Sequence, residues 1–328
     1  MYQVQPERTM EKNSKQYDVI VVGEVNVDLI MNQLQSLPEI GKEKLSGNMN
    51  LTLGSSAAIL ANNLSALGAK VAFVGKAGKD FFGKFCKEEL ERSKVDTSML
   101  LMTEEFQTGA TVVLNFGEDR ANVTFLGAMV SLKPEDITEE MISRARHLHF
   151  SSYFLQPAFK NKIHTLFKRA KYAGLTTSLD VQWDPQELWE FDYEKILPDV
   201  DIFLPNEIEL LNLAKKKTVE EALALVGKYG NVIVVKKGKN GSVLFYKDQL
   251  IEGKPFLNNQ VVDAIGAGDS FNAGFIFKFL KNNPAEKCQV FANLIGAVST
   301  TAAGGTGAFI NYQEVVKIAK EKFAYGEC

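Results

Sequence analysis

The sequence predicts an α/β fold, namely a doubly wound, mostly parallel sheet flanked by helices, with a small β-sheet lid. Short apolar runs that end in glycine, which are typical of strands buried on both faces of a parallel sheet, alternate with helical segments. Two stretches, about 29–53 and 108–126, interrupt this alternation and contain strand-like segments. The length of 328 residues suits one core, so we expect a single domain over 17–323 and a loose polar tail over 1–16.

The first part of the predicted body begins with the strand 17–23, whose YDVIVVG run is apolar and ends in glycine. A helix capped at Ser55 or Ser56 and ended by Gly68 follows, and then the strand 70–75. The same alternation predicts, in chain order, the helix 81–92, the strand 146–150, the helix 160–172, and the strands 175–180 and 201–204, the last of them followed by another helix.

The interrupting stretch 108–126 contains the segments TGATVVLNFG and ANVTFLG, which predict two strands around a turn at Glu118 and Asp119. Together with 29–53 they would form a small accessory sheet. Inserted beside the carboxyl ends of the main strands, such a sheet would cover a ligand as a lid.

The last third of the chain predicts a strand, a hairpin and three helices. The strand is 232–236, the hairpin pairs 241–246 with 249–252, and the helices start near Ala267, Pro284 and Tyr312. We find no internal repeat and no low-complexity segment in the sequence, which favours one core with a lid over two domains.

Charge and composition exclude several classes of partner. The 37 basic and 40 acidic residues leave a net charge of -3, which gives no electrostatic footprint for nucleic acid or for an anionic membrane. No stretch approaches the roughly 18 consecutive apolar residues of a membrane span. Cys86, Cys288 and Cys328 are odd in number and lack metal-ligand spacing, which favours a reduced, cytoplasmic environment.

The most informative segment is 262–275, VDAIGAGDSFNAGF, a turn of small residues that opens a helix. With so few side chains in the way, the amides of Gly266, Ala267 and Gly268 can point at one anion, and the positive end of the helix dipole adds to them. Asp269, in the first helical turn, would lie beside that anion as a general base for an incoming hydroxyl group. The arrangement suits phosphoryl transfer, although the string alone is equally compatible with a turn whose Asp269 only caps the helix.

Together these landmarks resemble the ribokinase-like family of ATP-dependent sugar and nucleoside kinases, the PfkB carbohydrate kinases, over nearly the whole chain from 18 to 323. The string 263–269 is similar to the family's Asp-Thr-x-Gly-Ala-Gly-Asp signature, with Ala264 in place of the usual threonine. The resemblance implies that the amides of 266–268 hold the transferring phosphoryl group and that Asp269 takes the proton.

A second landmark, DIFLPNEIE at 201–209, resembles the family's Asn-x-x-Glu motif, which organises Mg²⁺ around the triphosphate. Asn206 and Glu209 match the motif, and their spacing at a helix start turns both side chains the same way. Magnesium favours such oxygen donors and keeps much of its water shell, so the resemblance implies that both residues hold Mg²⁺ through water. Outside the family context, Asn206 reads as a helix cap and Glu209 as a solvated acid.

For the nucleotide, the resemblance implies contacts from Lys236 and Gly238 at a strand end and from Asn293 in a helix beside adenine. The glycines at 304–307 are similar to the loop that encloses adenine, and the alternative interpretation is a helix stop. As in some relatives, Asp263 and nearby carbonyl groups would hold a monovalent cation such as K⁺.

On the acceptor side, GEVNVD at 23–28 matches the family's opening, which implies that Asp28 accepts hydrogen bonds from sugar hydroxyl groups. Gly54 begins the stretch that lies against the sugar, but Ser55 replaces its second glycine and Ile59 stands where an asparagine often touches the substrate. Arg120, at the end of the lid hairpin, resembles a position that reaches an acidic or phosphorylated acceptor in some members, or is a solvated turn residue.

Tyr153 and the segment 180–185, DVQWDP, follow strands at the expected edge of the active site, as they do in relatives that handle hexose-like acceptors. The resemblance therefore implies a substrate contact from Tyr153. His147 and His149 share one face of a predicted strand, and we interpret them as packed or partly exposed imidazoles rather than a metal site.

The sequence therefore predicts a kinase that uses ATP and Mg²⁺ to transfer the γ-phosphoryl group to a hydroxyl of a small sugar or sugar acid. A nucleoside kinase of the same fold, and a sensor that binds sugar or nucleotide without turnover, stay open as alternatives. An NAD-dependent oxidoreductase and a P-loop kinase are disfavoured because the chain lacks a Gly-x-Gly-x-x-Gly turn after the first strand and a Gly-x-x-x-x-Gly-Lys-Ser/Thr string. The exposed edge of the lid sheet predicts a homodimer formed through the lids.

Overall fold

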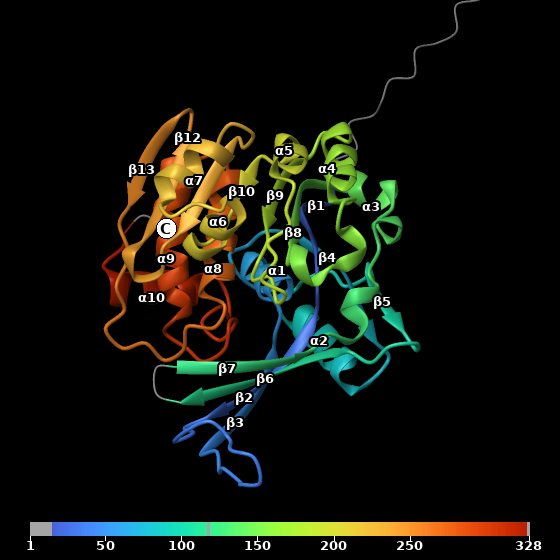
Figure 1. The fold of residues 1–328 in the computed structure, drawn as a ribbon, viewed down its shortest axis with the longest axis vertical. Helices are drawn as coiled ribbons and strands as arrows, with labels where there is room; N and C mark the ends of the chain where they lie inside the picture. Colours follow the sequence, from blue (N-terminus) through green and yellow to red (C-terminus); the bar gives the residue numbers. More distant parts are fainter. Residues whose placement is uncertain (1–14, 117–118, 327–328) are drawn as a thin grey trace, which may run out of the picture.

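The computed structural model describes residues 15–116 and 119–326. Within these ranges nine strands form one sheet, in the order β13-β12-β11-β10-β9-β8-β1-β4-β5, and four strands form a second sheet, in the order β3-β2-β6-β7. Figure 1 shows the larger sheet and its helices as the body of the molecule, with the smaller sheet set against one end of the body. The structure confirms the predicted doubly wound, mostly parallel sheet with a small β-sheet lid.

The strands of the body are short, apolar and mostly parallel. In sheet order they are β13 (Gln249–Gly253), β12 (Ser242–Tyr246), β11 (Val232–Lys236), β10 (Ile202–Phe203), β9 (Thr176–Asp180), β8 (Ala145–Ser151), β1 (Tyr17–Val22), β4 (Val71–Gly78) and β5 (Leu100–Thr103). Neighbours from β11 to β5 pair in parallel, whereas β11–β12 and β12–β13 are antiparallel, as the predicted strand and hairpin require. Because β4 lies on one side of β1 and β8 on the other, the carboxyl ends of β1 and β8 flank the switch point at which such sheets bind ligands.

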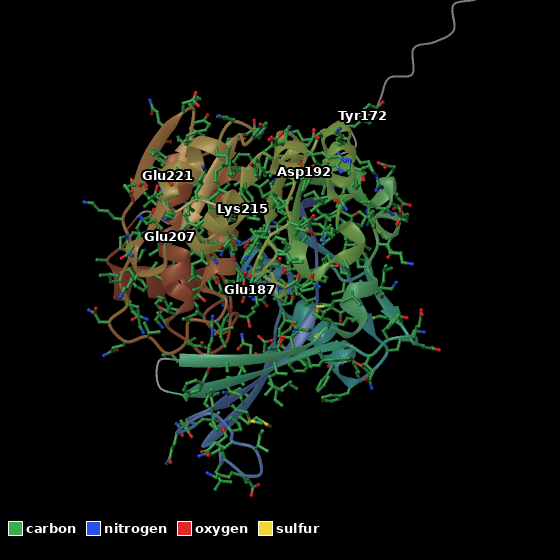
Figure 2. All side chains as sticks on the ribbon, viewed as in Figure 1. Tyr172, Glu187, Asp192, Glu207, Lys215 and Glu221 are labelled. Atoms are coloured by element: carbon green, nitrogen blue, oxygen red, sulfur yellow. The ribbon has the colours of Figure 1, made fainter. Side chains whose placement is uncertain are left out.

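Helices cover both faces of the body sheet, because its strands bury apolar side chains on both faces. One face packs against α1 (Ser56–Ala66), α2 (Phe81–Arg92), α8 (Ala267–Leu280), α9 (Ala285–Ser299) and α10 (Tyr312–Phe323), and the other against α3 (Glu139–Ser143), α4 (Ile163–Tyr172), α5 (Tyr193–Ile196), α6 (Glu207–Ala214) and α7 (Val219–Val226). Figure 2 shows Lys215 and Glu221 among the charged side chains at the end of α6 and on α7. None of the helices in the described residues combines the length and the apolarity that a membrane span needs.

Most predicted element boundaries agree with the structure. The helix α2 spans 81–92 as predicted, and the three closing helices start at Ala267, Ala285 and Tyr312. The helix predicted at 160–172 starts later, at Ile163, because a 3-10 turn at Pro157–Phe159 precedes it. The sequence analysis did not predict β5, α3, α5 or α7.

The lid sheet consists of β2 (Asn26–Asn32), β3 (Asn48–Leu53), β6 (Gly109–Phe116) and β7 (Asp119–Phe125). Its first strand begins at Asn26, three residues before the predicted start, so Asp28 belongs to the lid. Of the predicted turn, Glu118 lies outside the described residues, and Asp119 begins β7. Because side chains alternate along a strand, Asp28 and Leu29 point to opposite faces of the lid.

Of the predicted tail, residues 1–14 lie outside the described residues. Lys15 Nζ donates a hydrogen bond to the carbonyl of Ser143 at 2.8 Å, and Gln16 Oε1 accepts one from Arg144 Nη2 at 2.7 Å. The last two residues of the predicted tail are therefore fastened to the C-terminal end of α3.

The N-terminus of α1 contains a serine in a backbone conformation that favours glycine. Ser55 caps the helix with φ 68° and ψ 140°. Its Oγ donates to the carbonyl of Glu24 at 2.7 Å and accepts from the amide of Ala58 at 3.0 Å. These two hydrogen bonds offset the backbone strain at Ser55.

We expect Ser55→Ala to lower the free energy of unfolding by about 1–2 kcal/mol, because alanine loses both hydrogen bonds and keeps the strained φ. Ser55→Gly should lose less, because glycine adopts this φ without strain. Urea denaturation of the two variants measures the difference. A glycine variant less stable than the alanine variant would contradict the strained-backbone interpretation.

Candidate active site

Polar side chains gather where the parallel strands of the body end. Glu24 follows β1, Asp180 ends β9, Asn206 follows β10, and Lys236 ends β11. Because the carboxyl ends of parallel strands lie at one edge of the sheet, these side chains face the same region. The helix α8 starts beside this edge and carries Asp269 in its first turn.

Asp269 is buried and held by two hydrogen-bond donors. Ser56 Oγ donates to Asp269 Oδ1 at 2.5 Å, and Gln182 Nε2 donates to the same oxygen at 3.1 Å. Burial raises the pKa of Asp269 to about 6; the hydrogen bond from Ser56 opposes this rise, and the charge of Asp180 adds to it. A positioned carboxyl group with a pKa near neutrality is suited to general base chemistry.

Lys236 forms an ion pair with the fully buried Asp180, close enough to Asp269 to affect its pKa. Its Nζ lies 2.9 Å from Asp180 Oδ2, which also accepts a hydrogen bond from Asn272 Nδ2. Burial lowers the pKa of Lys236, but the charges of Asp180 and Glu209 outweigh it, so the pKa is raised and the ammonium group stays charged. A methyl group on Gly268 would come within 3.8 Å of Lys236 Nζ, which puts this positive charge beside the turn that precedes α8.

The turn before α8 depends on a glycine and leaves backbone donors at its end. Gly266 caps α8 with φ 71°, and a methyl group there would come within 2.5 Å of the Cα of Gly305. The amides of Ala267 and Gly268 belong to the first helical turn and have no carbonyl partner within α8. That of Ala267 makes only a long contact, 3.4 Å, with the carbonyl of Ala264, so these amides are suited to bind an anion.

Asp263 fastens this turn to the glycine-rich loop 304–307. Its Oδ1 accepts a hydrogen bond from the amide of Ile265, and its Oδ2 accepts one from the amide of Gly304, both at 2.9 Å. Gly305 in turn lies against Gly266, behind the turn. This arrangement gives Asp263 a structural role, and a monovalent cation at Asp263 stays a prediction.

A cavity of about 650 Å³ is lined by residues from both the lid and the body. The lid contributes Asp28, Thr111, Arg120 and Asn122, and the body contributes Glu24, Ser56, Gln182, Trp183, Gly266 and Asp269, among others. Figure 2 shows Glu187, which lies a few residues after Trp183, near the middle of the molecule. The cavity thus brings together Asp28, Arg120 and Asp269, which the sequence analysis assigned to the acceptor and the base.

The carboxyl group of Asp28 is buried against Gly54. A methyl group on Gly54 would come within 2.2 Å of Asp28 Oδ1, so glycine leaves room for this side chain. Burial raises the pKa of Asp28 to about 7; the charges of Asp269 and Asp263 add to the rise, and Arg120 opposes it. The backbone of Gly54 therefore packs directly against the Asp28 carboxyl group.

A second cavity, of about 340 Å³, lies on the other side of the turn. Its lining includes Lys236, Gly238 and Asn293, the predicted nucleotide contacts, together with Ala267 and Gly268. Much of the remaining wall is apolar, from Phe256, Leu257, Val261, Gly296 and Ala297. Since Gly266 and Asp269 line the first cavity, the 266–269 turn separates the two.

Tyr153 does not line the cavity that contains Asp269. Ser152 has φ 59° and turns the chain, so that Tyr153 begins a 3-10 turn. The Tyr153 ring packs edge-to-face on Phe191, with 5.3 Å between ring centroids. It lines a third cavity, of about 320 Å³, which adjoins the first at Leu155.

Asn206 and Glu209 form a capping box at the start of α6. Asn206 N donates to Glu209 Oε2, and Glu209 N donates to Asn206 Oδ1, both at 2.8 Å. Burial raises the pKa of Glu209 to about 7, the charge of Asp180 adds to the rise, and Lys236 opposes it. In the described part of the chain, no group of three or more His, Cys, Asp and Glu side chains is placed to hold a metal ion directly. Asp180, Glu209 and Asp269 outnumber the one ammonium beside them, which fits an oxygen-liganded cation held through water.

The polar residues of the site that were not assigned from the sequence include Glu24, Ser56 and Gln182. Glu24 Oε1 accepts hydrogen bonds from Ser56 N at 2.8 Å and from Ser152 Oγ at 2.6 Å. The available signals were the position of Glu24 in the same short run as Asp28, and Gln182 within DVQWDP. Ser56 gave only the signal of a helix cap.

The two central histidines are packed, as the sequence analysis expected. His147 and His149 are fully buried, and each has a ring nitrogen 2.7 Å from Ser178 Oγ. Burial lowers the pKa of each to about 3, so both are neutral.

Known proteins resemble this chain over most of its length. Residues 16–310 match the model of the pfkB family carbohydrate kinases. An uncharacterized sugar kinase from Archaeoglobus fulgidus is 30% identical over 71% of this chain and 92% of its own length, and an ATP-dependent ribose-1-phosphate kinase from Halopiger xanaduensis is 28% identical over 88% of this chain and 94% of its own. The structure of Arabidopsis thaliana ribokinase complexed with ribose and ATP superimposes with a TM-score of 0.80 at 26% identity, covering 93% of this chain and 99% of that one.

We expect Asp28→Asn to stabilise the protein at pH 8 and to have a smaller effect at pH 5. The pKa of Asp28 is raised from 3.8 to about 7 in the folded state, so the folded state binds the proton more tightly than the unfolded state does. Burial of this carboxyl group therefore destabilises the fold progressively as the pH rises from about 4 to about 7, by about 4 kcal/mol above that range. Urea denaturation of both proteins at the two pH values measures the effect; an equal difference at both would contradict it.

Proposed function

The chain belongs to the pfkB family of carbohydrate kinases, and from that premise we propose that it transfers the γ-phosphoryl group of ATP to a hydroxyl group of a small sugar or sugar acid. The observation that carries the proposal is the 266–269 turn, which separates two cavities and exposes a carboxyl group to one and amide donors to the other. A phosphoryl group bound at the turn would therefore have the nucleotide on one side and the acceptor on the other.

In the proposed reaction, Asp269 takes the proton of the acceptor hydroxyl group. The hydroxyl oxygen then bonds to the γ-phosphorus of ATP as the proton leaves. The bond between that phosphorus and the bridging oxygen breaks, and ADP leaves. The amides of Ala267 and Gly268, together with the Lys236 ammonium, stabilise the negative charge that develops on the phosphoryl oxygens.

The second cavity suits the nucleotide. Its apolar wall, built from Phe256, Leu257 and the small residues Gly296 and Ala297, can accept a flat adenine ring. The phosphates would extend from there to the turn at Gly268. Bound Mg²⁺, held through water by Asn206 and Glu209, would supply positive charge to the triphosphate.

The first cavity suits a polyhydroxylated acceptor. Asp28 and Asn122 offer oxygen acceptors and an amide donor at its lid side, and Arg120 offers a cation for an acidic group. Trp183 is 47% exposed and lines this cavity, and its indole presents an apolar face on which the carbon-bound hydrogens of a sugar ring can pack. These features support a sugar or sugar acid as the acceptor.

The outer face of the lid supports a homodimer. Cross-strand rows of apolar side chains cover this face, namely Leu51, Leu29, Val112 and Val123 in one row and Met49, Met31, Leu114 and Ala121 in the next. Met49 and Val123 are more than half exposed. Leu51 packs in part against the core, and a second copy of the lid would remove the exposed remainder of this apolar surface from water.

We expect ADP release when the protein is mixed with ATP, Mg²⁺ and a panel of sugars and sugar acids, and a loss of about 10² to 10⁴ in turnover in Asp269→Asn. The variant should still bind ATP, because the nucleotide cavity is lined by other residues. A coupled ADP assay measures turnover, and calorimetry measures binding. Turnover with nucleosides alone would identify a nucleoside kinase, and ligand binding without ADP release from any acceptor would identify a sensor.

We expect the protein to have the mass of a dimer in solution and Met31→Glu to have the mass of a monomer, because the glutamate would place a charge in the apolar rows. Light scattering after size-exclusion chromatography measures both masses. Asn48→Glu, at the exposed end of the edge strand β3, is the matched control. A monomeric mass for the unmodified protein at micromolar concentration would contradict dimerisation.

A further inference from the structure

The two oxygens of the Asp269 carboxyl group have different surroundings. Oδ1 accepts hydrogen bonds from Ser56 Oγ at 2.5 Å and from Gln182 Nε2 at 3.1 Å. Between 15 and 326, excluding 117 and 118, no side chain donates a hydrogen bond to Oδ2. Two donors from separate segments of the chain thus fix one oxygen and leave the other for a ligand.

The direction of the hydrogen bonds around Ser56 follows from its single hydroxyl proton. Because that proton is donated to Asp269, the hydroxyl of Ser151, 2.8 Å from Ser56 Oγ, must be the donor in the contact between the two serines. Gln182 Nε2 also donates to Ser56 Oγ, at 2.8 Å. The Ser56 hydroxyl group thus accepts hydrogen bonds from two donors, which direct its own proton toward the Asp269 carboxylate.

Local contacts and backbone conformation place both donors. Glu24 Oε1 accepts a hydrogen bond from the amide of Ser56 at 2.8 Å, which ties the first turn of α1 to the end of β1. Gln182 has φ 60°, an uncommon conformation for this residue type, which directs its side chain back toward the carboxyl edge of the sheet. Its Nε2 also lies 3.1 Å from Asp180 Oδ2, beside the ion pair with Lys236.

From this geometry we infer that Ser56 and Gln182 are positioning residues for the base: by donating to Oδ1 of Asp269 they orient Oδ2 toward the acceptor hydroxyl and favour the charged form that receives its proton. The inference rests on the proposed kinase function. The inference goes beyond that function because neither residue need touch ATP or the acceptor to affect the reaction.

The charges around Asp269 determine what losing a donor should do. Asp180, Glu24, Asp28 and Glu209 are acidic neighbours whose ionised forms disfavour the ionisation of Asp269, and Lys236 favours it. The hydrogen bonds from Ser56 and Gln182 lower the pKa of Asp269 against this excess of negative charge and against burial. Removing either donor should therefore raise the pKa of Asp269. As the pH falls, the carboxylate should then become protonated, and stop acting as a base, at a higher pH.

The test compares Ser56→Ala and Gln182→Met with the unmodified protein in two measurements. The first is the pH titration of the Asp269 carboxyl carbon by nuclear magnetic resonance, with Asp269→Asn identifying the signal. The second is the pH profile of kcat/KM with the best acceptor of the ADP-release panel. We expect both the titration and the acid limb to move to higher pH, by about one unit for each lost donor.

The matched control is Ser65→Ala, which removes a hydroxyl from the same helix, where Ser65 Oγ donates to the carbonyl of Ser93 at 2.6 Å. It should leave both pH profiles unchanged. A purely structural role for Ser56 and Gln182 would lower activity equally at every pH, and that result would overturn the inference. An unmoved Asp269 titration would overturn it and leave the kinase function standing, whereas absence of ADP release from every acceptor would overturn both.

Discussion

The buried ion pair between Lys236 and Asp180 is the interaction on which the rest of the site depends. Asp180 has no exposed surface, and breaking such a pair by removing one partner typically costs about 3–5 kcal/mol, because the remaining charge has no compensation. Lys236 is also the positive charge that opposes the raised pKa values of Glu209 and Asp269. The positive charge of Lys236 thus lowers the cost of burying several carboxyl groups together. The same ammonium group lies beside the first turn of α8.

The body of the fold was predictable because its elements are defined by local signals. The strand β1 is an apolar run ending in glycine, and α2 and the three closing helices follow clear changes of pattern. The strand β5 was missed because it is only four residues long and lies at the sheet edge. An edge strand is not buried on both faces, so its sequence lacks the long apolar run that marks the central strands. The first lid strand was predicted too late because Asn26 and Asp28 interrupt its apolar pattern.

The site was predictable only where one segment carries the chemistry. Asp269 and the amides before it lie within a few residues of one another, so a local string was enough to propose their roles. Ser56 and Gln182 could not be assigned in this way, because they meet Asp269 from positions 213 and 87 residues away in the chain. Tyr153 was expected at the acceptor because it follows β8, but the left-handed turn at Ser152 carries it into the neighbouring aromatic cluster.

The two cavities draw on separate stretches of the chain, and this division bears on how such a protein can diversify. Apart from Ile265 and the shared 266–269 turn, the first cavity is built from residues between 24 and 185, whereas the second uses residues between 236 and 300. Substitutions in the lid strands can therefore reshape the first cavity without disturbing the walls of the second. A gene duplicate could acquire a new ligand in the first cavity by changing residues before 186 while it inherits the second cavity intact.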